Sequence, residues 1–200
     1  AKAQGMKGTQ FRNPEGLTAA GHFTTARDLG LLATRLLADF PEYVPYYAIQ
    51  RYRYAGTPKS NDTNRNTLLF RDPSVDGLKT GHTNAAGYCL VATAQRDMPQ
   101  VGGRRLLSIV LGTTSENARA NESQKLLNWG YTAYDAVKLF EAGQAMEDAL
   151  LWKGSQSSVK RGREAATVVT VPSGSSGQLS TRIERQDPLI APIAKGQQIG

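Results

Sequence analysis

A short run near the middle of the chain combines residue types that could bind and activate a ligand. Residues 76–83 read Asp-Gly-Leu-Lys-Thr-Gly-His-Thr, so that Lys79, Thr80 and Gly81 are adjacent. A lysine can supply a fixed cation beside a nucleophile and its substrate, and a threonine hydroxyl can hydrogen-bond a carboxylate. A glycine lacks the Cβ that would keep a ligand backbone at a distance. The segment therefore predicts a site for an anionic ligand that lies close to the main chain.

The residues around this run are expected to form strands and a helix that position it. We expect strands at 75–80, 87–96 and 104–113, because each is a short run bounded by glycines or turn residues. Ser115 can cap a helix over about 116–129, with an acidic residue near its positive end. The residues of this helix that are expected to face the core are Leu126, Leu127 and Trp129.

The first part of the chain is expected to be irregular as far as residue 23, with a turn at 13–16. Thr25 and Asp28 have the spacing of a capping box, and leucines at helical spacing follow. A helix is therefore predicted over about 25–39. Residues 40–74 are polar and turn-rich, with a hairpin expected around 52–57. Their tyrosines are expected to pack against the protein rather than to form a platform for sugars: Tyr43, Tyr46, Tyr47, Tyr52 and Tyr54.

The pattern of residue types in the sequence changes after about residue 134. Short β-like runs alternate with turns from there to the end of the chain, which is typical of a small all-β domain. The expected strands are 136–140, 149–152, 166–171, 179–184 and 189–193. The sequence therefore predicts an α+β domain over residues 1–133 and a separate β-rich domain over residues 134–200.

Composition and charge exclude several functional classes. No apolar run approaches the roughly 20 residues that a membrane-spanning helix needs. The net charge of +7 arises mainly in residues 1–133, which carry 16 Lys and Arg against 10 Asp and Glu. These cations are scattered, so we expect no nucleic-acid partner. With two histidines and one cysteine we also expect no metal and no cofactor, and Cys89 is predicted to be a small buried hydrophobe.

Several motifs together resemble the D-alanyl-D-alanine carboxypeptidases, which are low-molecular-mass penicillin-binding proteins. The resemblance extends in order over the whole chain and is strongest in residues 1–130. It is carried by the segments at 5–6, 13–17, 64–69, 77–87, 104–107 and 125–130. It implies part of a penicillin-binding, β-lactamase-like transpeptidase domain, an antiparallel sheet with helices. It also implies a serine that attacks the penultimate D-alanine of a peptidoglycan pentapeptide and is acylated by β-lactams.

The same resemblance assigns roles to residues of this chain. Lys79 resembles the lysine of the family's third motif, and the backbone N–H of His82 resembles one of two oxyanion donors. Thr80 and Arg119 resemble groups near the terminal carboxylate of the substrate, and Arg65 resembles an arginine of the same cleft. Two further residues are expected to contact the substrate: Gly81 and Thr83.

The nucleophile that the family requires is missing before Lys79. Its Ser-x-x-Lys and Ser-x-Asn motifs precede Lys-Thr-Gly, whereas the only similar patterns here, at 157–160 and 115–117, follow it. We expect Ser157 to belong to the β-rich region and Ser115 to be a helix cap, so this chain alone is expected to be inactive. Ala1 is not a natural start, and the family implies a membrane anchor beyond Gly200 and a periplasmic location at the inner membrane.

Two other functions are consistent with the sequence. A class A β-lactamase relative also contains Lys-Thr-Gly, but such an enzyme would end near its last helix and would lack the region after residue 134. A non-catalytic module that binds the cell wall would need no serine. A Ser-x-x-Lys motif upstream of this chain would favour the enzyme over both alternatives.

Overall fold

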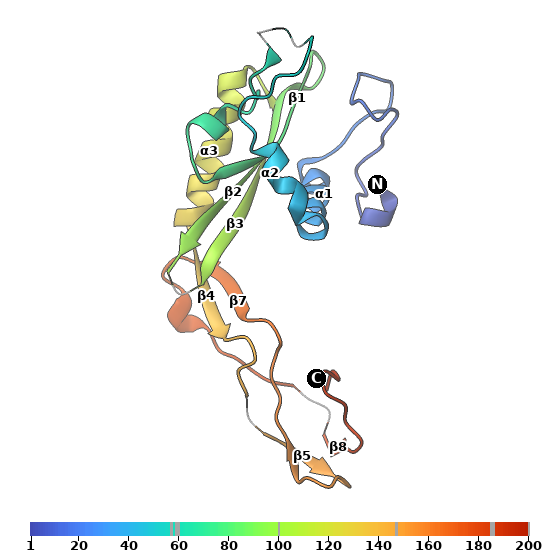
Figure 1. Ribbon diagram of the computed structural model, residues 1–200, viewed down its shortest axis with the longest axis vertical. Helices are drawn as coiled ribbons and strands as arrows, with labels where there is room; N and C mark the ends of the chain where they lie inside the picture. The colour runs from blue at the N-terminus through green and yellow to red at the C-terminus, as the bar shows by residue number, and fades with distance from the viewer. Residues whose placement is uncertain (57, 59–60, 100, 147, 185–186, 200) are drawn as a thin grey trace. The chain divides into compact units, whose positions relative to one another are not determined.

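The computed structural model describes residues 1–56, 58, 61–99, 101–146, 148–184 and 187–199 (Figure 1). The chain divides into two compact units. The first comprises residues 1–97 and 103–132, and the second comprises residues 98–102 and 133–200. Within the described residues, no helix is both long enough and apolar enough to cross a bilayer.

A three-stranded sheet forms the centre of the first unit. Its strands are β1 (Val75–Thr83), β2 (Gly87–Met98) and β3 (Gly102–Thr113), in the order β1-β2-β3. β1 pairs antiparallel with β2 and is an edge strand among the residues that the structure describes, so the segment that contains Lys79 has one side without a partner strand there. All three predicted strands are confirmed, although each is longer than the sequence indicated.

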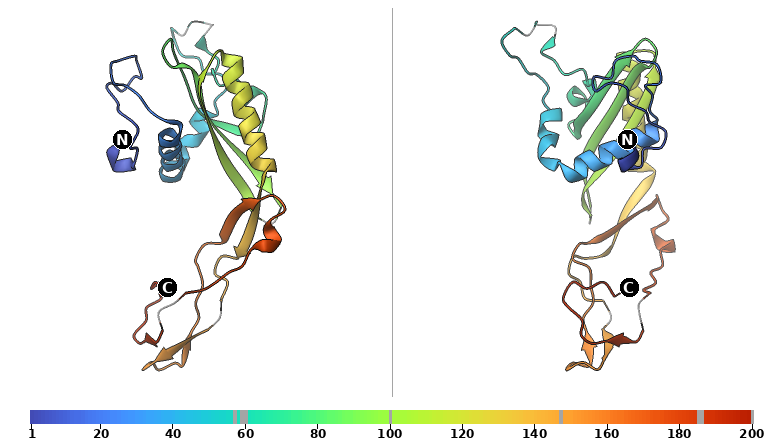
Figure 2. Two further views of the ribbon diagram at one scale, coloured as in Figure 1. Left: turned by 180° about the vertical axis from the view of Figure 1, so that it is seen from behind. Right: turned by 90° about the vertical axis from the view of Figure 1, so that its right-hand side faces the viewer.

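Two helices cover opposite faces of this sheet (Figure 2). Helix α1 (Ala26–Asp39) begins after Thr25, whose hydroxyl accepts a hydrogen bond from the backbone N–H of Asp28 at 3.1 Å. The Asp28 carboxylate is buried and accepts hydrogen bonds from Gly8 N at 2.8 Å and Thr9 Oγ1 at 2.6 Å. The predicted helix and its cap are therefore confirmed, and the acidic residue also fixes the N-terminal loop.

Helix α3 (Glu116–Thr132) covers the other face, and its buried side differs from the predicted one. Leu127 is buried as expected, with 1% of its surface exposed. The prediction was wrong for Leu126 and Trp129, which are 46% and 57% exposed. The buried stripe consists of small and polar residues at helical spacing, which a search for large apolar residues passes over. Its members are Arg119, Ala120, Ser123, Leu127 and Tyr131.

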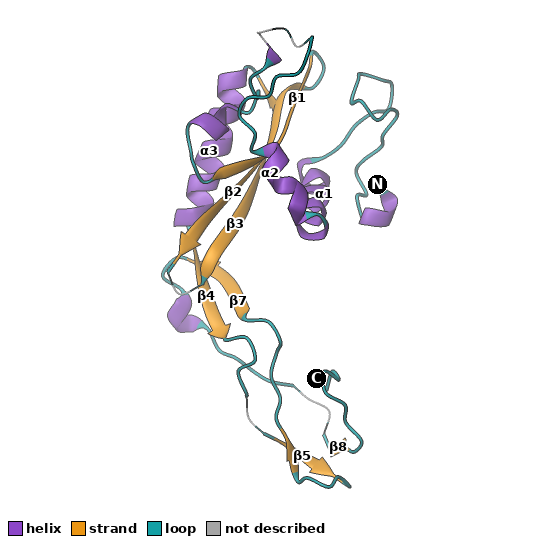
Figure 3. Ribbon diagram, in the orientation of Figure 1, coloured by secondary structure: helices purple, strands orange, loops and turns teal. Residues whose placement is uncertain are grey.

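The rest of the first unit consists of short helical turns and loops (Figure 3). They include η1 (Lys2–Gln4), η2 (Pro41–Tyr43), α2 (Val44–Tyr47) and η4 (Thr67–Phe70). In place of the hairpin expected around 52–57, the described residues show an isolated bridge between Arg51 and Thr63. Residue 57 lies outside the described residues. The tyrosines are less packed than predicted, because four of them are 50–67% exposed: Tyr43, Tyr46, Tyr52 and Tyr54.

The second unit consists of short strands. β4 (Tyr134–Phe140) pairs antiparallel with β7 (Thr167–Pro172). β5 (Ala149–Trp152) pairs antiparallel with β6 (Ser158–Val159) and parallel with β8 (Leu189–Ile190), and η5 covers Ser176–Gln178. The strand predicted at 179–184 is not formed. The one predicted at 189–193 is limited to two residues, because Pro188 and Pro192 cannot donate backbone hydrogen bonds.

Candidate active site

The residues that could bind or activate a ligand lie on the edge strand β1. Lys79, Thr80 and Gly81 pair with Val91, Leu90 and Cys89 of β2. Paired residues share a face and successive residues alternate, so Lys79 and Gly81 are on one face of the sheet and Thr80 is on the other. Lys79 is exposed, and its Nζ donates a hydrogen bond to the carbonyl oxygen of Thr80. The strand therefore presents an ammonium group and an open backbone edge together.

An apolar cavity of about 330 Å³ lies between α1 and the face of the sheet that carries Lys79. Leucines of α1 line one side, and residues 78–81 and 89–91 line the other. Cys89 is half-buried beside this cavity rather than fully buried, which corrects the sequence-based expectation. A Cβ added at Gly81 would lie 3.8 Å from the Cβ of Cys89, an ordinary contact. The protein itself therefore leaves room at Gly81.

His82 lies on the same face as Thr80, and its ring is stacked on a tyrosine. The centroids of the His82 and Tyr88 rings are 4.0 Å apart, with an angle of 27° between the planes. The guanidinium carbon of Arg119 lies 5.6 Å from the centroid of the Tyr88 ring. These three side chains form a continuous stack from the strand to α3, in which the His82 ring is the exposed end.

Arg119 connects two predicted site segments by hydrogen bonds to their main chains. Its side chain is 3% exposed. Nη1 donates to the carbonyl oxygen of Gly81 at 3.3 Å, and Nη2 donates to the carbonyl oxygen of Arg65 at 3.1 Å. Nη2 also lies 3.4 Å from Oε1 of Glu116, one turn earlier on α3. The structure thus brings Arg65, Gly81 and Arg119 together, and the Arg65 side chain itself is exposed.

Asn66 is a site residue that the sequence reasoning missed. It is 3% exposed, and its Nδ2 donates to the carbonyl oxygen of Gly77 at 2.9 Å, two residues before Lys79. Its Oδ1 accepts a hydrogen bond from Leu68 N at 3.2 Å. A buried amide must be hydrogen-bonded, so Asn66 fixes the loop that contains Arg65 against β1. The sequence signals were its position next to Arg65 and its place in the segment 64–69 that carries the family resemblance.

The comparisons with known proteins identify the family. Residues 1–115 match the family model described as D-alanyl-D-alanine carboxypeptidase. This match covers more than half of the chain.

The chain belongs to the D-alanyl-D-alanine carboxypeptidase family.

Residues 134–200 match a second model, penicillin-binding protein 5, C-terminal domain. The resemblance and the fold class inferred from the sequence are therefore confirmed.

Individual relatives agree with this family assignment. The chain is 39% identical to D-alanyl-D-alanine carboxypeptidase DacC of Escherichia coli and 36% identical to DacA of Haemophilus influenzae. These matches cover 100% and 98% of this chain but 48% and 49% of the relatives. The chain thus spans about half the length of the curated relatives it matches.

Solved structures of the family show the same fold. Penicillin-binding protein 5 of Haemophilus influenzae has a TM-score of 0.83 and 35% identity, and the match covers all of this chain and 56% of that one. Penicillin-binding protein D2 of Listeria monocytogenes, solved in the cefotaxime-bound form, has a TM-score of 0.56 and 33% identity. That match covers 65% of this chain and 51% of the Listeria chain.

The remaining candidate residues have local structural roles. Ser115 Oγ accepts a hydrogen bond from Ala118 N at 3.0 Å, so Ser115 caps α3 as predicted. Thr83 Oγ1 accepts one from Ala86 N at 3.0 Å in the turn between β1 and β2. Among the described residues, no three His, Cys, Asp or Glu side chains come together as metal ligands would.

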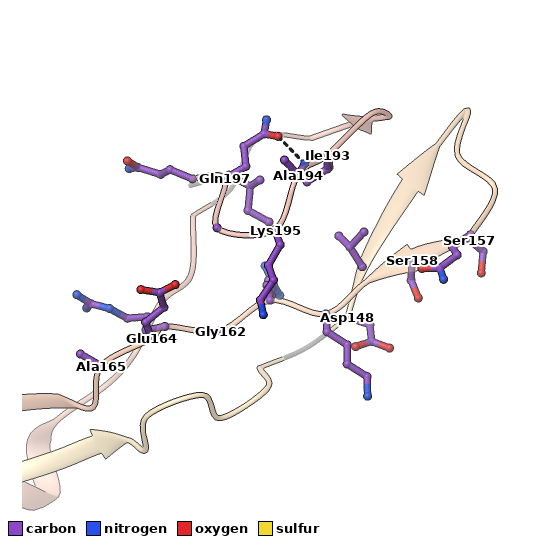
Figure 4. Close-up of a pocket in the computed structure, with 18 residues that line it drawn as sticks. Asp148, Ser157, Ser158, Gly162, Glu164, Ala165, Ile193, Ala194, Lys195 and Gln197 are labelled. Atoms are coloured by element: carbon purple, nitrogen blue, oxygen red, sulfur yellow. Dashed lines mark hydrogen bonds between the residues drawn. The ribbon is translucent and has the colours of Figure 1, made fainter.

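Ser157 belongs to the second unit, where it lines an open cavity of about 970 Å³ (Figure 4). Ser157 and Ser158 line this cavity beside the short strands β5 and β6, and Lys195 extends into it from the loop at 193–199. The cavity is lined by the chain on both sides of β6, including Lys160. Ser157 and Lys79 therefore belong to different units.

Proposed function

We propose that the protein containing this chain is a serine-type D-Ala-D-Ala carboxypeptidase. It would remove the terminal D-alanine of peptidoglycan stem peptides through an acyl-enzyme. The observation that carries the proposal is the edge strand β1, which presents Lys79-Thr80-Gly81 in a chain of this family. An open strand edge can pair with an extended peptide through the backbone N–H and C=O groups that face away from its partner strand.

In this proposal the residues of β1 bind and orient the substrate and stabilise charge. Lys79 supplies a cation beside the nucleophile, and the backbone N–H of His82 donates to the oxyanion that forms when the carbonyl carbon is attacked. Thr80 donates its hydroxyl to the terminal carboxylate of the substrate, while Gly81 and Thr83 contact the substrate main chain. The stacking of His82 on Tyr88 supports this role, because it restrains the ring and with it the end of the strand.

Arg65 and Arg119 would provide positive charge for the same carboxylate. The exposed guanidinium of Arg65 can approach a ligand directly, whereas Arg119 is buried and donates to the carbonyl oxygens of Gly81 and Arg65. Arg119 therefore acts partly by holding these two segments in place. A guanidinium has five N–H donors, so these bonds and the one to Glu116 leave donors for a substrate oxygen.

The nucleophile would come from a part of the protein outside these 200 residues. The family's Ser-x-x-Lys pattern occurs here only at 157–160, in the second unit. Ser115 is engaged as a helix cap. We therefore expect this chain alone to be inactive, with residues 1–133 as the C-terminal part of the catalytic domain and 134–200 as a separate β-rich domain. The two family models that match 1–115 and 134–200 support this division.

The proposed ligands include β-lactams, and the proposed location is the bacterial periplasm at the inner membrane. Listeria penicillin-binding protein D2, 33% identical to this chain, has been solved with cefotaxime and with ampicillin bound. We expect such compounds to acylate a serine that has an activating base in the protein containing this chain. An enzyme that trims peptidoglycan must work where that polymer lies.

Release of D-alanine tests the proposal. The purified protein containing this chain should release D-alanine from a peptide that ends in D-Ala-D-Ala, and Lys79→Ala should abolish most of this activity. Lys125→Ala is a matched control, because Lys125 is an exposed cation of α3 that pairs with Glu122 and lies in no site segment. A folded wild-type protein that releases no D-alanine would overturn the proposal.

A further inference from the structure

Strand β1 contains one more residue than its partner near its beginning. Val75 and Gly77 pair with adjacent residues of β2, so Asp76 is the additional residue of a β-bulge. The register is regular from Gly77 to the end of β1. Lys79 follows the bulge by three residues, so the presence of the bulge determines which face of the sheet Lys79 occupies.

A single arginine from the far strand fixes this bulge. Arg105 of β3 donates from Nη1 and Nη2 to the two carboxylate oxygens of Asp76, each at 2.7 Å. The same two nitrogens donate to Thr93 Oγ1 at 2.8 Å and to Gln95 Oε1 at 2.7 Å, both on the intervening strand β2. A planar guanidinium matches a carboxylate in this two-bond geometry, which restricts orientation as well as distance.

The consequence for the site follows from the period of a strand. Loss of the bulge would shift the register of the residues after it by one, which would move each of their side chains to the opposite face. Lys79 would then leave the face that it shares with Val91, and Thr80 would take its place. The bulge thus decides whether the ammonium group or the hydroxyl is presented on the α1 side of the sheet.

Gly77, the residue after the bulge, is closely surrounded and has little room to move. A Cβ at Gly77 would lie 3.0 Å from Cγ2 of Thr93 and 3.3 Å from Cβ of Tyr47. The carbonyl oxygen of Gly77 accepts the hydrogen bond from Asn66. The bulge is therefore held through the Asp76 side chain on one side and the Gly77 main chain on the other.

We propose that Arg105 is a positioning residue for the proposed acyl-transfer site, acting through Asp76 to fix the bulge that sets the face of Lys79. The proposal rests on the proposed function, because its readout is acylation. Arg105 itself touches no substrate. It holds a strand whose alternation places the cation beside the nucleophile.

The test measures acylation by a fluorescent penicillin in the protein containing this chain, with wild type, Asp76→Asn and Arg105→Gln. The labelled amount at completion reports how much protein is folded, and the first-order acylation constant reports positioning. We expect both variants to reach the labelled amount of the wild type with a constant lowered about 10- to 100-fold, since small misplacements of reacting groups have effects of this size. A variant that loses labelled amount but keeps its rate would show a merely structural role.

Asp72→Asn is the matched control, because Asp72 also pairs with an arginine of the same sheet. Its Oδ2 accepts a hydrogen bond from Arg96 Nη2 at 2.9 Å, and the arginines of the two pairs are similarly exposed, 31% for Arg96 and 28% for Arg105. Asp72 precedes β1 and is not in the bulge. We expect its acylation constant to stay near that of the wild type. Equal losses in Asp72→Asn and Asp76→Asn would contradict the proposal.

Two further variants make the test independent of folding failure in either single variant. Arg105→Lys keeps the charge but lacks the planar pair of nitrogens that bonds Asp76, Thr93 and Gln95 together, so it should restore little of the rate. The double variant Asp76→Asn/Arg105→Gln should be no slower than either single variant, because the two residues act as one unit. Full rescue by lysine, or additive losses in the double variant, would overturn the proposal. An unlabelled wild type would instead overturn the proposed function.

Discussion

Arg119 Nη1 donates a hydrogen bond to the carbonyl oxygen of Gly81 across 3.3 Å, joining helix α3 to the strand that presents Lys79. The second terminal nitrogen of the same guanidinium donates to the carbonyl oxygen of Arg65. One buried cation therefore fixes the separation between the loop of Arg65 and the edge strand. Arg119 therefore has a structural role in addition to the role proposed for it near the substrate carboxylate.

Arg119→Ala should weaken catalysis by the protein containing this chain. A hydrogen bond to a charged group contributes roughly 1.5–3 kcal/mol, so kcat/KM for peptides ending in D-alanine should fall about 10- to 150-fold. Lys125→Ala on the same helix should change nothing measurable, because that side chain is 71% exposed. An Arg119→Ala protein that is folded and has unchanged kcat/KM would reject the assignment.

Thr80→Val should act in the same direction but less severely. Valine keeps the shape of threonine and removes only the hydroxyl, whose bond to the substrate carboxylate has one ionised partner, whereas a bond from Arg119 would have two. A hydrogen bond to a charged group contributes roughly 1.5–3 kcal/mol, and we expect the lower end for a neutral donor, a loss of about 10-fold in kcat/KM. Steady-state kinetics on the same peptide measure it. A loss as large as that of Arg119→Ala would mean that Thr80 has another role.

The buried side of α3 can be tested by two adjacent leucines. Leu127→Ala should lower the free energy of unfolding by about 2–5 kcal/mol, because it leaves a cavity in the core. Leu126→Ala should have a much smaller effect, because Leu126 is 46% exposed whereas Leu127 is 1% exposed. Denaturant unfolding measures both. Similar losses for the two variants would contradict this helix orientation.

The stabilising contribution of Asp72 to the folded state should be lost at acidic pH. Burial raises the pKa of its carboxyl, but hydrogen bonds from the Ser74 hydroxyl and backbone and the pairing with Arg96 outweigh burial and lower the pKa below its usual value. A carboxyl with a lowered pKa in the folded state adds stability above its unfolded pKa and loses it as pH falls through the folded pKa. The Tm difference between wild type and Asp72→Asn should therefore be full near pH 7 and shrink below about pH 4. A constant difference down to about pH 2 would be inconsistent with this pairing.

The sequence predicted the sheet and α1 because their patterns are local. The strand runs near Lys79 are bounded by glycines, and Thr25 precedes leucines at helical spacing. The prediction of which side of α3 is buried was wrong, because the buried stripe contains Arg119, Ala120 and Ser123, whose burial depends on tertiary partners. The strand at 179–184 failed because no partner strand is available to it among the described residues.

The residues of the candidate site were predictable where they belong to a continuous motif. Lys79, Thr80, Gly81 and His82 do, whereas Asn66 and Arg105 act through long-range hydrogen bonds to Gly77 and Asp76. Nothing in the spacing of residues 66 and 77, or 76 and 105, indicates that they meet. The roles of Asn66 and Arg105 could therefore be found only from the structure.

Locating the serine that penicillin acylates is the most direct measurement of the central claim. The protein containing this chain would be labelled with penicillin and digested, and the modified peptide identified by mass spectrometry. A parallel incubation would use the 200-residue chain alone. We predict an adduct on a Ser-x-x-Lys serine outside these 200 residues and none on the isolated chain. An adduct on Ser115 or Ser157, in either sample, would contradict the proposed function.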